Sequence, residues 1–183
     1  MAVERRLMTA DELFRLPDDN MRHELIRGEL RTMSPMGWRH AKITLKGGAS
    51  LLAHVEAHDL GIAGAGDIGF VLASNPDTVR APDVCFIRRE RIPEAGEPTG
   101  YWSIPPDLAI EVLSPNDRYT EVDKKVAEWL EFGVQLVLVI HPRRRTVAVH
   151  RPNRPTRILT EDDTLDGEDV VPGWSLPVRD LFV

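Results

Sequence analysis

The chain has a single cysteine, Cys85, among its 183 residues. One cysteine excludes an internal disulfide, and it excludes a zinc site built from several cysteines. Long hydrophobic runs are also lacking, since the longest, Leu136–Ile140, is far too short to cross a bilayer. Residues 1–6 lead into no apolar segment, so no signal peptide is predicted. We therefore expect a cytoplasmic protein with no membrane partner.

An excess of positive charge is lacking too, because the net charge is −6. This argues against a strongly basic nucleic-acid coat protein. A nucleic-acid enzyme is not excluded, because a divalent-metal site needs carboxylates and its ions supply positive charge locally. The charge is uneven: His141–Arg157 holds six arginines and no acid, whereas Glu161–Asp169 holds six acids and no base. Either these are two solvated edges that partly neutralise each other, or the basic edge contacts phosphate.

Length and patterning predict one domain spanning residues 1–183. A chain of this size buries roughly 70% of the surface that its unfolded form exposes, so its core needs no disulfide for support. Thr9–Glu12 has the pattern of a capping box, which predicts a short helix ending before Pro17. Two strands joined by a turn at Gly28 and a long helix are expected next, over 23–26, 29–32 and 38–59.

The segment 107–140 has the most regular pattern in the chain. A buried strand over Asp107–Leu113 precedes a helix over Glu121–Phe132, which ends at Gly133, and an apolar strand follows over Val134–Ile140. Strands on either side of a helix indicate a βαβ crossover, so we predict an α/β fold with antiparallel (α+β) margins. Further strands are expected over 68–72, 83–87, 146–150 and 157–160, with turns over 75–77 and 114–117 and a loop over 88–100.

Glu111 is the most informative candidate residue, because it interrupts the apolar strand that ends at Leu113. An ionised carboxylate in such a strand is costly unless it is paired, hydrogen-bonded or bound to metal. Strand alternation places Glu111 on one face with Asp107, Ala109 and Leu113, and places Leu108, Ile110 and Val112 on the other face. Two interpretations stay open at this point, a metal ligand and a buried structural ion pair.

Asp83 is a better partner for Glu111 than Asp107 is. Asp107 shares the face of Glu111 but lies about 13 Å away along the strand, so one ion cannot be held by both. Asp107 is expected to cap a turn or to accept hydrogen bonds from backbone amides. Asp83 follows Pro82 at the start of a neighbouring strand.

The helix after the strand carries two adjacent lysines, Lys124 and Lys125. At about 100° per residue, Lys125 lies roughly 60–80° from the centre of the apolar face and Lys124 lies near the opposite pole. A lysine on the flank can lay its stem along the sheet and bring its ammonium to the carboxylates. This favours Lys125, the alternative being that both lysines are ordinary surface residues.

Two carboxylates and a lysine that converge at a strand end favour phosphodiester hydrolysis. Mg²⁺ prefers oxygen ligands, keeps several waters and takes only one or two carboxylates, and Mn²⁺ is a possible substitute. The metal would polarise the scissile phosphate and activate a water, and Lys125 would stabilise the developing negative charge. The residues alone thus predict hydrolysis of phosphodiester bonds with the help of Mg²⁺.

The order and spacing of several short motifs resemble the Uma-type family of restriction endonucleases, in the PD-(D/E)XK nuclease superfamily. The resemblance covers nearly the whole chain, from Thr9 to Phe182, and it implies a restriction-endonuclease-like central mixed sheet flanked by helices. It also implies a Mg²⁺-dependent endonuclease with DNA as its substrate. It is carried by the segments His23–Leu30, Pro82–Val84, Pro106–Pro115, Lys125–Trp129 and Gly133–Val134.

The resemblance implies a role for each matched position. Asp83 and Glu111 match the two acidic residues of the motif, and Val112 would contribute its main-chain carbonyl to the metal ion. The superfamily's lysine position falls here on Leu113, and the family supplies its lysine at the position of Lys125 instead. The chain departs from the family at three positions. His23 and Trp129 stand where Tyr is common in the family, and Arg27 stands where an acidic residue is common.

Two further matched residues are weighed against structural alternatives. Glu24 matches an N-terminal glutamate that often completes such sites, the alternative being a hairpin residue paired with an arginine. His40 lies near a matched histidine and could orient a phosphate or a water, the alternative being a packing or capping role. His54 and His58 have the spacing of a zinc pair but lack a third ligand, so we interpret them as a solvated helix face.

Other classes of function stay open beside the nuclease. The first is a catalytically silent protein of the same fold that binds nucleic acid or a protein partner, which the net charge favours and the carboxylates oppose. The second is a glycosidase built on a carboxylate pair, which the low aromatic content of 6% disfavours. A homodimer is also expected, because nucleases that cut both strands often use two sites.

Overall fold

The computed structural model describes residues 6–94, 96–115 and 117–183. The predicted absence of a signal peptide, which concerns residues 1–6, therefore falls almost entirely outside the described residues, as does Asn116 in the predicted turn over 114–117. The two ends of that turn are described. The Ser114 N–H donates to Asp117 Oδ2 at 2.7 Å, and the Asp117 N–H donates to the Ser114 carbonyl at 3.2 Å.

The described part of the chain contains three α-helices, twelve strands and two short 3₁₀ helices. The α-helices are α1 (Ala10–Phe14), α2 (Trp38–Ala57) and α3 (Tyr119–Glu131), and the 3₁₀ helices are η1 (Arg89–Arg91) and η2 (Val178–Leu181). The strands are β1 (Arg22–Ile26), β2 (Glu29–Met33), β3 (Gly61–Ala65), β4 (Phe70–Ala73), β5 (Thr78–Arg80), β6 (Val84–Arg88), β7 (Leu108–Val112), β8 (Leu136–His141), β9 (Thr146–His150), β10 (Arg157–Leu159), β11 (Thr164–Asp166) and β12 (Ser175–Pro177).

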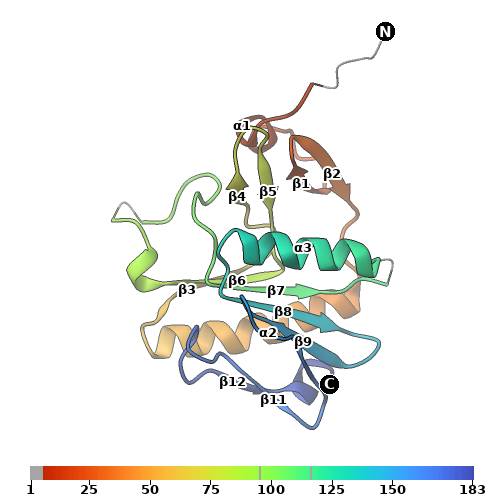
Figure 1. The fold of residues 1–183 in the computed structure, drawn as a ribbon, viewed down its shortest axis with the longest axis vertical. Helices are drawn as coiled ribbons and strands as arrows, with labels where there is room; N and C mark the ends of the chain where they lie inside the picture. Colours follow the sequence, from red (N-terminus) through yellow and green to blue (C-terminus); the bar gives the residue numbers. More distant parts are fainter. Residues whose placement is uncertain (1–5, 95, 116) are drawn as a thin grey trace.

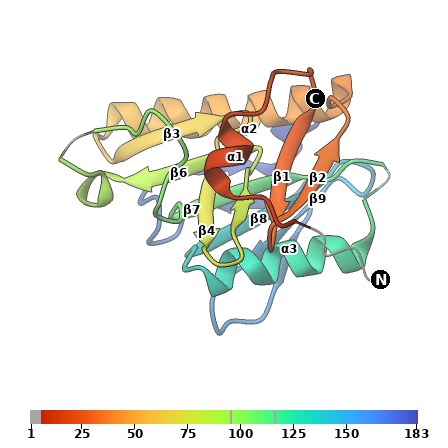
Figure 2. The ribbon, with the colours of Figure 1, turned by 90° about the horizontal axis from the view of Figure 1, so that it is seen from above.

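A six-stranded mixed sheet forms the centre of the molecule, with strand order β10-β9-β8-β7-β6-β3. Only β7 and β8 within it are parallel, and α3 connects them, as the predicted βαβ crossover requires. Helix α2 covers one face of this sheet and α3 covers the other, which Figure 2 shows edge-on. The expected central mixed sheet flanked by helices is thus confirmed.

A second sheet, with order β2-β1-β5-β4, stands above one end of the central sheet together with α1 (Figure 1). Its hairpin turns at Arg27 and Gly28, whose φ angles of 51° and 78° suit a type I′ turn. Leu25 in β1 pairs with Val79 in β5, so the neighbouring Glu24 is brought close to the chain leading into β6. This small sheet therefore carries an N-terminal residue to the central sheet.

Alternation along the central strands produces two apolar layers. Leu108, Ile110 and Val112 of β7 pack on the α2 side with Ile43 and Leu51, whereas Ala109 packs on the α3 side with Val126 and Trp129. Glu111 belongs to the α3 face by the same alternation, as predicted. The polar side chain is therefore buried beneath α3 and within reach of the polar groups on that helix.

Most of the predicted elements are confirmed, and their ends differ by a few residues. The capping box at Thr9 and Glu12 is present, and α2 continues through Gly47 and Gly48. The strand predicted over 68–72 begins only at Phe70, and the turn at 75–77 leads into β5 instead of directly into β6. Strands β3, β5, β11 and β12 were not predicted, because β3 is rich in Gly and Ala and the other three are only three residues long.

Within the described residues, the helices include none that combines the length and apolar character needed to span a bilayer.

Candidate active site

Glu111 and Lys125 form a part-buried ion pair between β7 and α3. Lys125 Nζ donates to Glu111 Oε2 at 2.9 Å, and the indole N–H of Trp129, one turn further along α3, donates to Glu111 Oε1 at 2.8 Å. Lys124 is exposed. Lys125 therefore reaches Glu111 from the flank of its helix, as predicted. The hydrogen-bond partners of Glu111 are an ammonium and an indole, and not a guanidinium.

Glu24 brings a second carboxylate to the same ammonium from the small sheet. Its Oε1 lies 3.1 Å from Lys125 Nζ and accepts the Ala81 N–H at 3.2 Å, while its Oε2 lies 2.6 Å from Arg80 Nη1. Arg80 continues to Glu128 on α3, whose Oε2 accepts its Nε–H at 2.8 Å. Glu24 therefore pairs with an arginine, as the structural interpretation expects, and it also contacts the candidate lysine, as a role in the site would require.

Asp83 lies beside Glu111, just before β6 begins. The β6–β7 register pairs Val84 with Ile110, so extending it by one residue brings Asp83 level with Glu111. Asp83 Oδ2 accepts the Val112 N–H at 2.7 Å and lies 3.2 Å from His40 Nε2, and its Oδ1 lies 3.4 Å from Arg22 Nη2. The N–H and carbonyl of one strand residue point to the same edge, so the Val112 carbonyl also points towards the Asp83 side.

The electrostatic environment differs among the three acids. Burial raises the pKa of Glu111; the ammonium of Lys125 opposes this rise and the charges of Asp83 and Glu24 add to it, so the pKa reaches about 7. Burial also opposes ionisation of Glu24, but Lys125 and Arg80 outweigh it and lower its pKa. At Asp83 burial is outweighed by His40 and the Val112 N–H, so its pKa is lowered too.

Lys125 responds to the two acids around it. Burial acts to lower its pKa, but the charges of Glu111 and Glu24 outweigh burial and hold the pKa above its usual range. The side chain is about one-fifth exposed, so the ammonium is paired without being sealed from solvent. Lys125 is therefore a fixed positive charge and not a proton donor near neutral pH.

The donor atoms suit Mg²⁺ in type. Asp83, Glu111 and the Val112 carbonyl offer the one or two carboxylates and the backbone oxygen that this ion accepts, with water completing its shell. Each Glu111 oxygen accepts one hydrogen bond from the protein and keeps a further lone pair. Among residues 6–94, 96–115 and 117–183, we find no group of three or more Asp, Glu, His or Cys side chains that could hold a metal ion. A metal here would depend on two carboxylates, the carbonyl and water.

Other residues singled out from the sequence lie elsewhere. Asp107 accepts the Arg88 N–H at 2.9 Å and lies 2.8 Å from Arg91 Nη1, so its predicted backbone-amide role is confirmed. His54 Nε2 lies 2.9 Å from the Pro172 carbonyl, and His58 Nδ1 lies 2.9 Å from the His54 carbonyl. The two imidazoles stack on each other, and no metal group forms around them among the described residues.

Three polar partners in this site were not predicted as such from the sequence: Arg22, Arg80 and Trp129. Trp129 was placed on the buried face of its helix, and a buried indole N–H needs an acceptor. That requirement was the signal that could have linked Trp129 to Glu111. Arg80 sits in a three-residue strand that sequence reasoning missed, so its burial could not be foreseen.

Comparisons with known proteins identify a family and a solved structure that this chain resembles. Residues 10–179 match the family Uma2, described as "Putative restriction endonuclease". A crystal structure of a putative nuclease of the DUF820 group from Anabaena variabilis superposes with a TM-score of 0.82 and 28% sequence identity, covering 96% of this chain and 97% of that chain. A search of the curated proteins finds no match. Since the family match spans most of the chain, and the fold agrees with that of this putative nuclease, the protein belongs to the Uma2 family of restriction-endonuclease-like proteins.

Proposed function

We propose that this protein is a Mg²⁺-dependent endonuclease that hydrolyses phosphodiester bonds in DNA. The observation that carries the proposal is the meeting of Asp83, which immediately precedes β6, with Glu111 of β7 and Lys125 of α3. Membership of a nuclease family and likeness to a nuclease structure support the same chemistry. A structural ion pair alone would not require a second carboxylate held level with Glu111.

Each residue has a distinct role in the proposed mechanism. Asp83, Glu111 and the Val112 carbonyl would hold the cation, which supplies Lewis acidity and an activated water when it is bound. Lys125 places a positive charge where the phosphate develops negative charge during attack. Glu24 holds that ammonium in place from the opposite side.

Two further residues act through the acids. His40 lies against Asp83 Oδ2 and, together with the Val112 N–H, fixes the orientation of that carboxylate. Trp129 fixes Glu111 through its other oxygen, which leaves the Glu111 carboxylate in one orientation. Preorganisation of this kind lets a site stabilise charge without rearranging during the reaction.

The test uses purified protein with supercoiled, linear and single-stranded DNA in the presence of Mg²⁺ or Mn²⁺. We expect cleavage that is lost in Asp83→Asn, Glu111→Gln and Lys125→Met. Lys124→Met is the matched control, because Lys124 is exposed on the same helix, and it should cleave like the wild type. If the wild type leaves every DNA form intact and Glu111→Gln does not alter metal binding, the proposal fails.

One observation favours a catalytically silent protein of the same fold. All three acids already accept hydrogen bonds from the protein, and Glu24 is neutralised by Arg80. Calorimetric titration with Mn²⁺ separates the two candidates. A saturable site that disappears in Asp83→Asn supports the nuclease, whereas the absence of saturation supports the silent binding protein.

We also propose that the protein forms a homodimer through α2. Trp38, Leu45 and Leu52 are spaced seven residues apart on its outer face and are 85%, 69% and 39% exposed. An apolar seam with this repeat is typical of helices that pair with another helix. Light scattering should report a dimer for the wild type and a monomer for Leu45→Glu, with Ala127→Glu at an exposed position of α3 as the charge-matched control. A monomeric wild type would contradict this assignment.

A further inference from the structure

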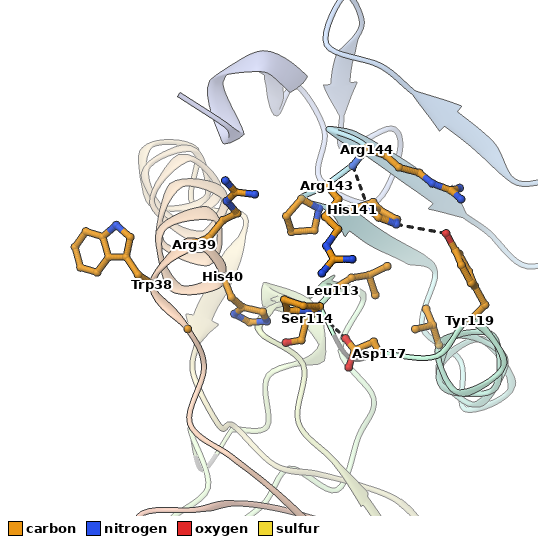
Figure 3. A pocket seen from close by; sticks show the side chains of 14 residues that line it. Trp38, Arg39, His40, Leu113, Ser114, Asp117, Tyr119, His141, Arg143 and Arg144 are labelled. Carbon is orange, nitrogen blue, oxygen red and sulfur yellow. Dashed lines mark hydrogen bonds between the residues drawn. The ribbon is translucent and has the colours of Figure 1, made fainter.

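A cavity of about 570 Å³ opens next to the candidate active site. Its walls come from the start of α2, the segment after β7, the start of α3 and the turn after β8 (Figure 3). His40 belongs to both places, since it lines the cavity and lies 3.2 Å from Asp83. The cavity therefore adjoins the proposed site of hydrolysis at the carboxyl ends of the two parallel strands, where ligands commonly bind in α/β sheets.

The cavity has a positively charged wall in a protein of negative net charge. Arg39, Arg143 and Arg144 line it, and none of the three forms an ion pair with any described residue. Figure 3 shows the guanidinium of Arg143 pointing into the cavity. The single acid among the described lining residues, Asp117, accepts the Ser114 N–H at 2.7 Å and so serves the local turn.

These arginines contrast with the rest of the same basic segment. Arg145, Arg151, Arg154 and Arg157 pair with acids of the following acidic segment, so the predicted partial neutralisation of the two segments is confirmed, although the Arg151 side chain is only 9% exposed and not solvated. Only Arg143 and Arg144 of the six arginines line the cavity. An arginine with no acidic partner, held at a concave surface, is well suited to bind phosphate.

The remainder of the cavity suits an aromatic base. Leu113, Val122, Pro115 and Pro142 provide an apolar lining. The guanidinium of Arg144 lies over the Tyr119 ring, 5.3 Å from its centroid, and Tyr119 is largely exposed. Bases of single strands bind by stacking on aromatic rings and guanidinium groups, whereas a duplex keeps its bases stacked inside.

We propose that this cavity binds one nucleotide of a single-stranded DNA segment adjacent to the scissile phosphate. Arg39 and Arg143 bind the backbone phosphates, and Tyr119 with the apolar lining receives the base. The absence of a side-chain cap and of acids in the first turn of α2 favours an anion at the same end. The assignment rests on the proposed nuclease function for its place in the reaction, but the binding itself needs no metal.

The experiment measures binding of a fluorescein-labelled oligothymidylate by anisotropy, at low salt and with EDTA present. Arg143→Ala should weaken binding about fivefold or more, and Tyr119→Ala about tenfold. Arg154→Ala is the matched control because it removes an equally charged, exposed side chain from the same segment, and it should change binding less than twofold. The melting temperature of each variant is measured as well, to check that the variant folds.

Three competitor probes sharpen the result. A short duplex and an abasic oligonucleotide of the same length should each compete about tenfold less well than the oligothymidylate, and inorganic phosphate should compete only at far higher concentration. Equal competition by the duplex, or equal losses in Arg154→Ala and Arg143→Ala, would overturn the assignment. Strand binding without any cleavage would refute only the nuclease, whereas cleavage that Arg143→Ala leaves unchanged would refute only the nucleotide cavity.

Discussion

Two groups of charged residues in this molecule use the same chemistry in different surroundings. Beneath α3, Glu24, Glu111, Lys125 and Arg80 form a buried network at the junction of the two sheets. Near the C-terminus, Glu168 collects three arginines, Arg151, Arg154 and Arg157, of which the last two are more than half exposed. Solvent screens the outer arginines of the second group, Arg154 and Arg157, whereas the first group must compensate for the loss of hydration through its own contacts.

The difference between exposed and buried ion pairs indicates which of them is informative about function. A surface cluster is inexpensive to keep and contributes little, so its presence needs no special explanation. A buried network costs folding free energy whenever one partner is lost, and apolar residues could fill the same space. Four charged groups retained beneath α3 therefore point to a use other than stability.

The largest effect is expected when the buried network loses its guanidinium. Arg80→Ala leaves Glu24 buried beside a single remaining cation, and it should lower the free energy of unfolding by about 3–5 kcal/mol. Arg157→Ala makes the equivalent change in the surface cluster. Urea unfolding of both variants checks the contrast, and similar losses for the two would remove the distinction between the groups.

Glu111→Gln separates stability from activity within the buried network. The amide oxygen can still accept the Trp129 N–H, and Lys125 keeps Glu24 as its partner, so the fold should survive. Loss of a preorganised charged group at the reacting centre should lower kcat by about 10²–10³. Cleavage assays at saturating Mg²⁺ measure this, and a variant with wild-type kcat would show that Glu111 is only structural.

Trp129→Phe removes the indole N–H while keeping an aromatic ring. A hydrogen bond to a charged partner is worth about 1.5–3 kcal/mol, so stability should fall by that amount and cleavage should weaken as Glu111 loses its orientation. Trp174→Phe is the matched control, because that buried indole donates to neutral Ser50 Oγ at 3.1 Å on the other side of the sheet. A loss of cleavage in both variants would argue against the positioning role.

Acidification should produce a smaller change that involves Glu24. Folding lowers the pKa of Glu24 from its ordinary value of 4.5. The ionised carboxylate therefore stabilises the fold fully above pH 4.5, and this stabilisation is lost as the pH falls through the lowered pKa. Urea midpoints between about pH 5 and pH 3 should therefore fall more steeply in the wild type than in Glu24→Gln. Parallel curves would mean that Glu24 gains nothing from its two cations.

Much of the central sheet and its crossover could be predicted from the sequence. The strands around Glu111 and Val137 are strongly apolar, and the helix between them has a clear apolar face, so local pattern and burial agree. The position of Lys125 followed from helix geometry alone. The Asp83–Glu111 pairing followed less directly, since it depends on the antiparallel register of β6 and β7.

The small sheet and the partners it supplies could not be predicted in the same way. β5 has three residues and pairs with β1 across more than fifty positions of the sequence, so no local pattern marks it. Arg80 reaches Glu24 and Glu128 only because that pairing forms. The cavity arginines show the same limit, because a basic run does not reveal which of its members find acidic partners.

The ammonium of Lys125 is held jointly by Glu24 from the small sheet and by Glu111 from the central sheet. It links the small sheet to the central sheet, whose strands belong to separate backbone hydrogen-bond ladders. An anion bound at this ammonium would compete with Glu24 for it, so we expect anion binding to weaken the contact between the two sheets. Arg80, which pairs with Glu24 and with Glu128 of α3, would remain as a second link between the small sheet and this helix.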